Sequence, residues 1–371
     1  MTPDNKKYYF CRYAHFLVTR GQSRSLITDV HGEATFFIPN DLCDLLQQYN
    51  GKKIADVYRE YGRANSKILD EYFEFLFAKD IIFLCSSEAE VQRFPPLSME
   101  WDFPATVSNA IVDVSAASKH PWKKILGALD ELNCPYLQVR CYNGFTLQRA
   151  VKEILAYLDA EESVVVNVEL FLPYQQGYSE KQYRDFLSAH KRIGMLVVHG
   201  APFTKKTEIK KGNLATLYFT QEAFENSTCC GVVHPQYFSA NMNHFTESLQ
   251  FNSCLNRKIS IDERGYIKNC PSMQQHFGHI DSVSLTTALN KPGFTALWNI
   301  TKNEIDTCKQ CEFRNICTDC RAYVQTPGNQ YSKPLKCGYD PETCTWNNWS
   351  EHPLSRLAAE HYGIAQPVAT A

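Results

Sequence analysis

The sequence lacks the signals that would place the chain in a membrane, outside the cell or on nucleic acid. Its first residues, MTPDNKKYYFCRYAHF, contain no apolar segment of signal-peptide length, and no run of about eighteen apolar residues occurs anywhere. The formal net charge of -2 offers none of the basic excess that nucleic-acid-binding proteins usually carry. We therefore expect a cytoplasmic protein whose partners are neither membranes nor nucleic acids.

Common catalytic signatures are missing as well. The sequence contains no phosphate-binding loop, no Gly-rich nucleotide fingerprint and no recognisable pair of nucleophile and base. These absences leave the catalytic residues unknown and favour an accessory role over catalysis. Any function must therefore be inferred from the residue types that the chain does concentrate.

Cysteine is the residue that this chain concentrates. Seven of its 15 cysteines lie in one patterned run. The run reads Cys254-x10-Gly265-x4-Cys270, then Cys308-x2-Cys311-x5-Cys317-x2-Cys320, and finally Cys337. A reducing cytosol favours free thiols and metal ligands over disulfides. So many soft ligands close together predict one or two thiolate cages for iron–sulfur clusters or zinc.

The first part of the chain, residues 7–86, has a winged-helix-like outline. The expected elements are extended pieces near residues 8–10 and 15–18, strands at 25–30 and 34–38, a helix from its N-cap Asn40 to Gly51, a second helix ending at Gly62, a third across 68–77 and a strand at 81–84. This order resembles the peptide-recognition domain of many enzymes that modify ribosomally made peptides, in which a leader peptide adds a strand to a hairpin edge. The alternative is a small packing domain without a ligand.

After a linker at residues 87–104, strands and helices alternate through residues 105–250. Strands are expected at 110–114, 136–140, 164–170, 195–199 and 214–219, and helices at 122–132, 146–158 and 179–190. This alternation predicts an α/β fold with parallel β/α units in a partial, TIM-like barrel. Chemistry in such sheets lies at the C-terminal strand ends, which directs attention to Asp113, Arg140, Cys141, Glu169 and His199. Each of them could equally be a hydrogen-bonded structural group.

A β/α region before a cysteine run resembles the arrangement in radical S-adenosylmethionine enzymes. Those enzymes carry a Cys-x3-Cys-x2-Cys loop after the first barrel strand, since three thiolates leave the fourth iron of a cluster open for the adenosyl donor. Here the corresponding residues after Val114 read SAASKHPW, and the triplet spacing occurs nowhere in the chain. The barrel is therefore degenerate, and we do not expect an ordinary radical reaction.

The cysteine run itself resembles the auxiliary iron–sulfur domain called SPASM. Gly265 lies in a turn between strand-like residues 258–261 and 266–267, so that Cys254 and Cys270 flank a hairpin. One departure is the Cys317-x2-Cys320 pair, which is one residue tighter than the usual pattern. The segments that carry the wider resemblance are NSCLNRKISID, KNCPSM, CEFRNICTDCRAY and KPLKCGY. With them, most of residues 8–350 resemble the SPASM-domain peptide maturase of grasp-with-spasm systems.

The resemblance implies a function and a set of partners. Such proteins act beside an ATP-grasp ligase on a ribosomal precursor peptide, so this chain is expected to be an accessory maturase that binds the leader. The alternative is a cluster-dependent redox enzyme that modifies the peptide itself. The implied division is a SPASM domain at residues 251–350 and a flexible tail at 351–371.

The resemblance also implies two ligand sets, for two 4Fe–4S clusters. The first set is Cys308, Cys311, Cys317 and Cys337. The second is Cys254, Cys270 and Cys320, whose fourth ligand is Cys344, Cys229, Cys230 or an exogenous group. Zinc is the alternative metal, but zinc ribbons separate their two knuckles by roughly 15 to 20 residues, and this chain separates them by five.

Overall fold

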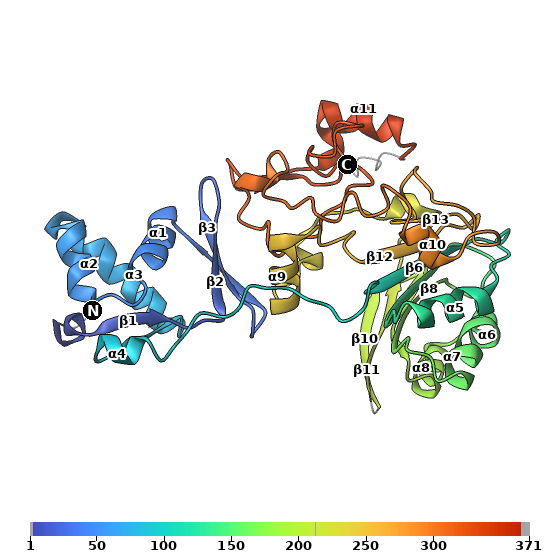
Figure 1. Cartoon of the computed structure of the whole chain (residues 1–371), viewed down its shortest axis with the longest axis horizontal. Coiled ribbons are helices and arrows are strands. Elements are labelled where there is room, and N and C mark those ends of the chain that lie inside the picture. The colour runs from blue at the N-terminus through green and yellow to red at the C-terminus, as the bar shows by residue number, and fades with distance from the viewer. Residues whose placement is uncertain (1–2, 212, 365–371) are drawn as a thin grey trace.

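The computed structural model describes residues 3–211 and 213–364, and its N-terminal part contains two small antiparallel sheets and three longer helices (Figure 1). The elements are β1 (Tyr9–Arg12), β2 (Phe16–Arg20), β3 (Ser25–Asp29), β4 (Ala34–Ile38), α1 (Asn40–Tyr49), α2 (Ile54–Tyr61), α3 (Ser66–Ala78) and β5 (Ile82–Cys85). β1 pairs with β5, and the other sheet has the order β2-β3-β4. The expected sequence of strands followed by three helices is present.

The β2-β3-β4 sheet is covered on both faces. Phe16 and Ile27 belong to the core formed with α1, α2 and α3, whereas Leu17 and Leu26 belong to a separate core formed with residues from the C-terminal part. Side chains alternate between the two faces of a strand, so neighbouring apolar residues serve different cores. The sheet therefore joins the N-terminal helices to the cysteine-rich part of the chain.

Asn40 does not act as the N-cap that the sequence predicts. α1 has Pro39 in the cap position, and no side chain caps the helix. The Asn40 amide instead donates to the Gln22 carbonyl oxygen at 2.9 Å and accepts from the Ser25 hydroxyl at 2.6 Å. The β2–β3 connection thus offers partners to both ends of the amide, and Asn40 holds that connection against the start of α1.

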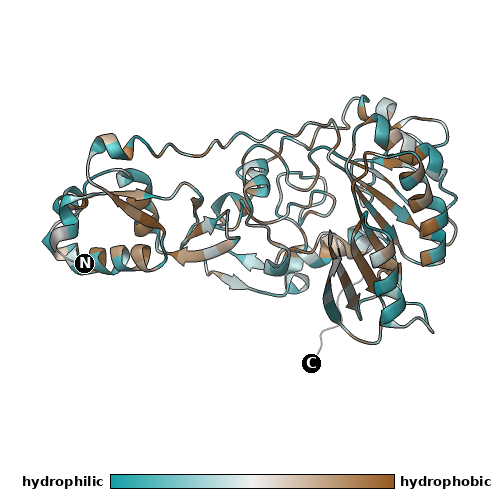
Figure 2. Ribbon diagram, turned by 90° about the horizontal axis from the view of Figure 1, so that it is seen from below, coloured by the Kyte–Doolittle hydropathy of each residue, from teal (hydrophilic) through white to brown (hydrophobic). Residues whose placement is uncertain are grey.

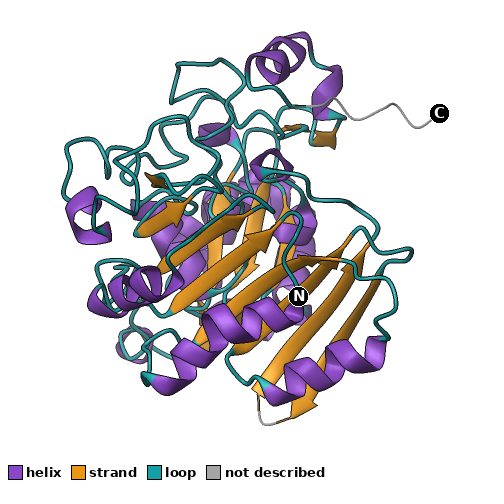
Figure 3. Ribbon diagram, turned by 90° about the vertical axis from the view of Figure 1, so that its right-hand side faces the viewer, coloured by secondary structure: helices purple, strands orange, loops and turns teal. Residues whose placement is uncertain are grey.

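The residues that follow form an open, largely parallel sheet of eight strands (Figure 3). Its elements up to residue 220 are α4 (Glu88–Val91) in the linker, β6 (Asn109–Val114), α5 (Trp122–Glu131), β7 (Tyr136–Cys141), α6 (Leu147–Ala150), α7 (Ala156–Ala160), β8 (Asn167–Pro173), α8 (Glu180–Ala189), β9 (Ile193–His199), β10 (Lys205–Lys211) and β11 (Asn213–Thr220). A π-helical turn at Val151–Leu155 connects α6 and α7. The apolar faces of α5, α7 and α8 form one core with the strands, many of which are brown in Figure 2.

The sheet continues into the C-terminal part. The remaining elements are α9 (Met242–Gln250), β12 (Lys258–Ile261), β13 (Ile267–Lys268), α10 (Leu285–Leu289), β14 (Tyr339–Asp340), β15 (Thr345–Trp346) and α11 (Pro353–His361). The order is β10-β11-β9-β8-β7-β6-β12-β13, and β12 lies parallel to β6. Six strands are parallel, with β10 and β13 antiparallel at the two edges. The sheet therefore spans residue 250, where the sequence predicts a domain boundary.

Residues 353–361, which lie inside the predicted flexible tail, form helix α11 instead. Ala358 and Ala359 are fully buried in a small core with Tyr323 and Leu335. Small side chains let this helix approach the loops closely, and such a contact gives no strong hydrophobic pattern in the sequence. Residues 365–371 of the predicted tail lie outside the described residues. Within the described ranges, no helix combines the length and apolar character needed to cross a membrane.

Candidate metal centres

Four cysteines of the first predicted set line one small cavity. Cys308 and Cys311 lie at the two ends of a tight turn, in which the Cys311 amide donates to the Cys308 carbonyl oxygen at 2.9 Å. Cys317 follows the next turn, and Cys337 reaches the same cavity through a bridge to Val233. The structure thus brings Cys308, Cys311, Cys317 and Cys337 together from separate loops.

A buried lysine accompanies this group. The Lys302 ammonium donates to the Cys317 sulfur at 3.1 Å and also to the Cys317 carbonyl oxygen. Burial raises the pKa of Cys317, and burial followed by the neighbouring thiolates raises the pKa of Cys308 and Cys311. Thiols whose pKa is raised need a cationic partner to become thiolates, and a bound metal supplies one.

The second predicted set is assembled by the β12–β13 hairpin. Cys254 precedes β12 and Cys270 follows β13, while Cys320 arrives from the loop beyond the first group. Burial, then the adjacent Cys254 thiolate, raises the pKa of Cys270 to about 11. Burial, then Cys254 and Cys270, also raises the pKa of Cys320. These three thiols are therefore electrostatic neighbours, with the Lys258 ammonium 3.6 Å from the Cys254 sulfur.

The three alternatives for a fourth thiol occupy different places. Cys230 lies with the second group, since its thiolate contributes to the raised pKa of both Cys270 and Cys320 after burial and Cys254. Burial raises the pKa of Cys229 to about 11, and the Arg140 guanidinium opposes that rise. Cys344 lies in the β14–β15 turn, with its sulfur 3.9 Å from the Pro341 carbonyl oxygen. Pro341 lines the cavity of the first group.

The polar residues at the strand ends form a buried structural network. Arg140 donates to both carboxylate oxygens of Asp113, at 2.7 and 2.8 Å, and the Tyr142 hydroxyl donates to the same carboxylate at 2.6 Å. Burial alone would lower the pKa of Arg140, but the Asp113 carboxylate and then the Cys230 thiolate outweigh burial and raise it. The C-terminal edge of β6 and β7 is therefore occupied by a satisfied ion pair.

The other strand-end candidates have structural partners or a different location. His199 contacts the Cys141 carbonyl oxygen through Nε2 at 2.8 Å, and its Nδ1 accepts from the Phe224 amide at 3.2 Å. Burial lowers the pKa of His199 and raises that of Cys141. Glu169 does not lie at a C-terminal strand end, because β8 runs on to Pro173. It accepts from Gln138 at 2.7 Å beside a cavity of about 230 Å³ over the sheet.

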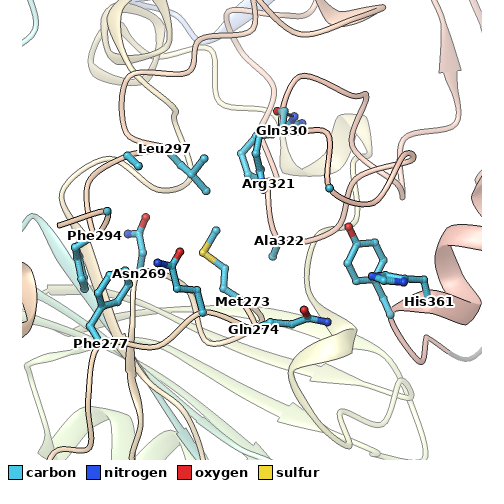
Figure 4. A pocket seen from close by; sticks show the side chains of 15 residues that line it. Asn269, Met273, Gln274, Phe277, Phe294, Leu297, Arg321, Ala322, Gln330 and His361 are labelled. Carbon is cyan, nitrogen blue, oxygen red and sulfur yellow. Dashed lines mark hydrogen bonds between the residues drawn. The ribbon is translucent and has the colours of Figure 1, made fainter. Parts of the chain in front are cut away.

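A larger cavity, which the sequence did not indicate, lies beside the second cysteine group. Its volume is about 440 Å³, and Asn269 and Arg321, which line it, immediately adjoin Cys270 and Cys320 in the sequence. Figure 4 shows Asn269, Arg321 and Gln330 around this space. The buried Asn269 Oδ1 and Gln330 Oε1 atoms have no hydrogen-bond partner among the described residues. Loops distant in sequence form this wall, so no local motif could identify it.

The donor sets suit iron–sulfur clusters. Both groups contain thiols and no histidine or carboxylate, and thiolate ligands are those that iron–sulfur clusters use. In the part of the chain that the structure describes, no three or more His, Cys, Asp or Glu side chains are arranged to hold a single metal ion. A multi-iron cluster does not require its ligands to converge on one ion.

Comparisons with known proteins give only distant likenesses. No protein-family model matches the chain, and no curated protein matches its sequence. Similar solved structures include SuiB from Streptococcus suis bound to S-adenosylmethionine, with 12% identity, a TM-score of 0.32 and coverage of 87% of this chain and 98% of SuiB. SuiB bound to its precursor peptide SuiA gives 11% identity, a TM-score of 0.28 and coverage of 88% and 98%. Scores this low do not establish a shared fold or function.

Proposed function

We propose that the protein is an accessory maturase for a ribosomally synthesised, post-translationally modified peptide. It binds the leader of the precursor and acts with an ATP-grasp ligase, which makes the new bonds. Its C-terminal part holds two 4Fe–4S clusters, with zinc as the alternative metal. The observation that carries this proposal is a small sheet that has a free strand edge and packs directly on the cysteine-rich part of the chain.

The free edge belongs to β4. Among the described residues, β4 pairs only with β3, so its outer backbone groups are available to a peptide strand. Phe36 on β4 packs toward α3, with its ring centroid 6.4 Å from that of Phe75. The Lys79 ammonium lies 5.8 Å from the Phe36 ring. A peptide added at this edge would gain main-chain hydrogen bonds and an aromatic wall for its side chains.

The same strand contacts the first cysteine group from its opposite face. The Phe37 ring lies 5.6 Å from Phe313, two residues after Cys311. The Arg24 guanidinium lies over Phe37 at 3.6 Å and donates to the buried Glu312 carboxylate at 2.7 Å. A leader held on β4 would therefore be presented beside the cysteine-rich part, which supports coupling of peptide capture to that part.

The chain's residues supply binding and orientation in this function. One cluster would be held by Cys308, Cys311, Cys317 and Cys337. The other would be held by the second group, Cys254, Cys270 and Cys320. Bound clusters would cross-link a loop-rich region and could carry single electrons. Lys302 and Lys258 would offset the charge of the thiolates.

A fluorescently labelled leader peptide tests the binding site. Phe36→Ala should weaken leader binding about thirtyfold, because a central aromatic anchor contributes about 2 kcal/mol to such an interface. Phe203→Ala is the matched control, since Phe203 is an exposed aromatic residue outside the N-terminal part. Unchanged affinity after deletion of residues 1–86 would refute leader capture by this part of the chain.

The second candidate function is a cluster-dependent redox enzyme that modifies the peptide itself. The cavity of about 440 Å³ next to Cys270 and Cys320 favours it, because this space could hold a peptide side chain near a cluster. Co-expression of precursor, ligase and this protein, each omitted in turn, separates the two functions by mass spectrometry. Bond formation that needs both proteins supports the accessory role, whereas a mass change without the ligase supports the redox enzyme.

A further inference from the structure

We propose that Cys230 is the fourth protein ligand of the second cluster, so that four thiolates close this cluster and none of its irons is open to substrate. This inference rests on the proposed iron–sulfur clusters and specifies one of them. The sequence left Cys344, Cys229, Cys230 and an exogenous group as alternatives. The arrangement of residues 227–233 selects among them.

The loop that carries Cys230 is held against both of the other segments that supply this group. The Ser272 hydroxyl, two residues after Cys270, donates to the Ser227 carbonyl oxygen at 3.1 Å. Gly231 packs on Cys320 so closely that an added Cβ atom would lie 3.0 Å from the Cys320 sulfur. Gly231 also has a φ of +84°, which side chains disfavour. Glycine at this position therefore lets the backbone approach the second group.

A buried lysine fixes the same loop from the other side. The Lys336 ammonium donates to the carbonyl oxygens of Thr228 and Cys230, the latter at 3.0 Å. Lys336 is only 5% exposed and precedes Cys337, a member of the first group. Three residues after Cys230, Val233 forms a β-bridge with Cys337. The position of Cys230 is thus set by contacts on each side of it.

Backbone geometry separates Cys230 from its neighbour. Cys229 ends a short 3-10 helical turn, Ser227–Cys229, whereas Cys230 has extended dihedral angles, φ -79° and ψ 170°. The Cys230 thiolate is among the leading charges that act on Cys270, Cys320 and Lys258, and Cys229 is not. Together with the packing of Gly231 on Cys320, these interactions select Cys230 rather than Cys229 as the thiol beside the second group.

Closure has a functional consequence. An iron bound by three cluster sulfides and its own protein thiolate has no vacant position for a substrate thiol, water or a small molecule. The second cluster would then serve as a cross-link or an electron carrier, in agreement with the accessory role. The alternative of an open iron beside Cys254, Cys270 and Cys320 requires Cys230 to remain unbound.

The lability of the fourth iron tests this inference. The full-length protein is purified without oxygen, reconstituted with iron and sulfide, and treated with a mild oxidant before electron paramagnetic resonance. The wild type should contain about eight irons per chain and give no three-iron signal, because every iron has four sulfur-containing ligands. Cys230→Ala should release one iron on oxidation and give a three-iron signal. Cys229→Ala, the adjacent matched control, should behave as the wild type.

Several outcomes would overturn the inference. A three-iron signal from the oxidised wild type would show an open iron, and a signal from Cys229→Ala or Cys344→Ala, but not Cys230→Ala, would assign another ligand. Zinc alone in every protein would instead reject the proposed clusters themselves. If Cys230→Ala does not fold, Cys230→Gly reconstituted with a small external thiol should recover the oxidation-resistant cluster. The proposal would also be contradicted if the external thiol failed to protect the cluster of Cys230→Gly from oxidation but protected that of Cys229→Gly or Cys344→Gly.

Discussion

The buried pair of Asp113 and Arg140 provides a quantitative test of how the sheet is stabilised. Their side chains are 0% and 6% exposed, and two hydrogen bonds join them. Asp113→Asn keeps the shape of the side chain but removes its charge, and leaves the Arg140 guanidinium buried without a counter-ion. Breaking a buried pair in this way destabilises proteins by about 3–5 kcal/mol.

Two further variants separate charge from packing. Tyr142→Phe removes one hydrogen bond to the carboxylate, a loss of about 1.5–3 kcal/mol, and leaves the ion pair intact. The double variant Asp113→Leu with Arg140→Met replaces the pair with apolar side chains, an exchange that is often close to neutral. We therefore expect the order of stability to be wild type, with the double variant near it, then Tyr142→Phe, then Asp113→Asn.

Urea unfolding followed by tryptophan fluorescence measures these differences. With a denaturant slope of about 3 kcal/mol per M, a loss of about 3–5 kcal/mol lowers the midpoint by about 1–1.7 M. A midpoint for Asp113→Asn no lower than that of Tyr142→Phe would refute the reasoning. So would a double variant that is less stable than Asp113→Asn, because the apolar pair should restore most of the loss.

Three other perturbations have defined outcomes. Burial raises the pKa of Glu247 from 4.5 to about 7, so the stabilisation that this side chain provides is complete below pH 4.5 and lost as the pH rises through 7. Between pH 6 and 8.5 the wild type should therefore lose about 1.4 kcal/mol more stability than Glu247→Gln, whose side chain does not titrate. Identical profiles of stability against pH for the two proteins would contradict this. Glu312→Gln should weaken the contact with Arg24 by about 1–2 kcal/mol and so speed backbone hydrogen exchange in β2, β3 and β4. Unchanged exchange rates would show that apolar contacts alone hold the sheet. Cys311→Ala should lower the iron content by about half and leave the second cluster's spectrum in place, and a loss of both clusters would show that they assemble together.

Most elements of the fold could be predicted because their signals are local. The apolar spacing of α5 and α8 predicts helices at 122–132 and 179–190, within a residue or two of the observed bounds. The strand at Lys205–Lys211 was missed because its sequence, KKTEIKK, is polar and pairs along a sheet edge. α11 was missed because alanines bury little surface, so that their periodicity is weak. In both cases the partner segment, distant in sequence, decides the conformation.

By itself, the sequence determined that the chain concentrates thiols in seven ordered positions, that strands and helices alternate through its middle, and that the three-thiol radical loop is absent. Only the tertiary structure decided which thiols meet, because distances between loops depend on how β12 joins β6 and how residues 227–233 return to the hairpin. Spacing along the chain cannot distinguish two adjacent cysteines, whereas the fold ends a helical turn at Cys229, extends the backbone at Cys230 and packs Gly231 on Cys320.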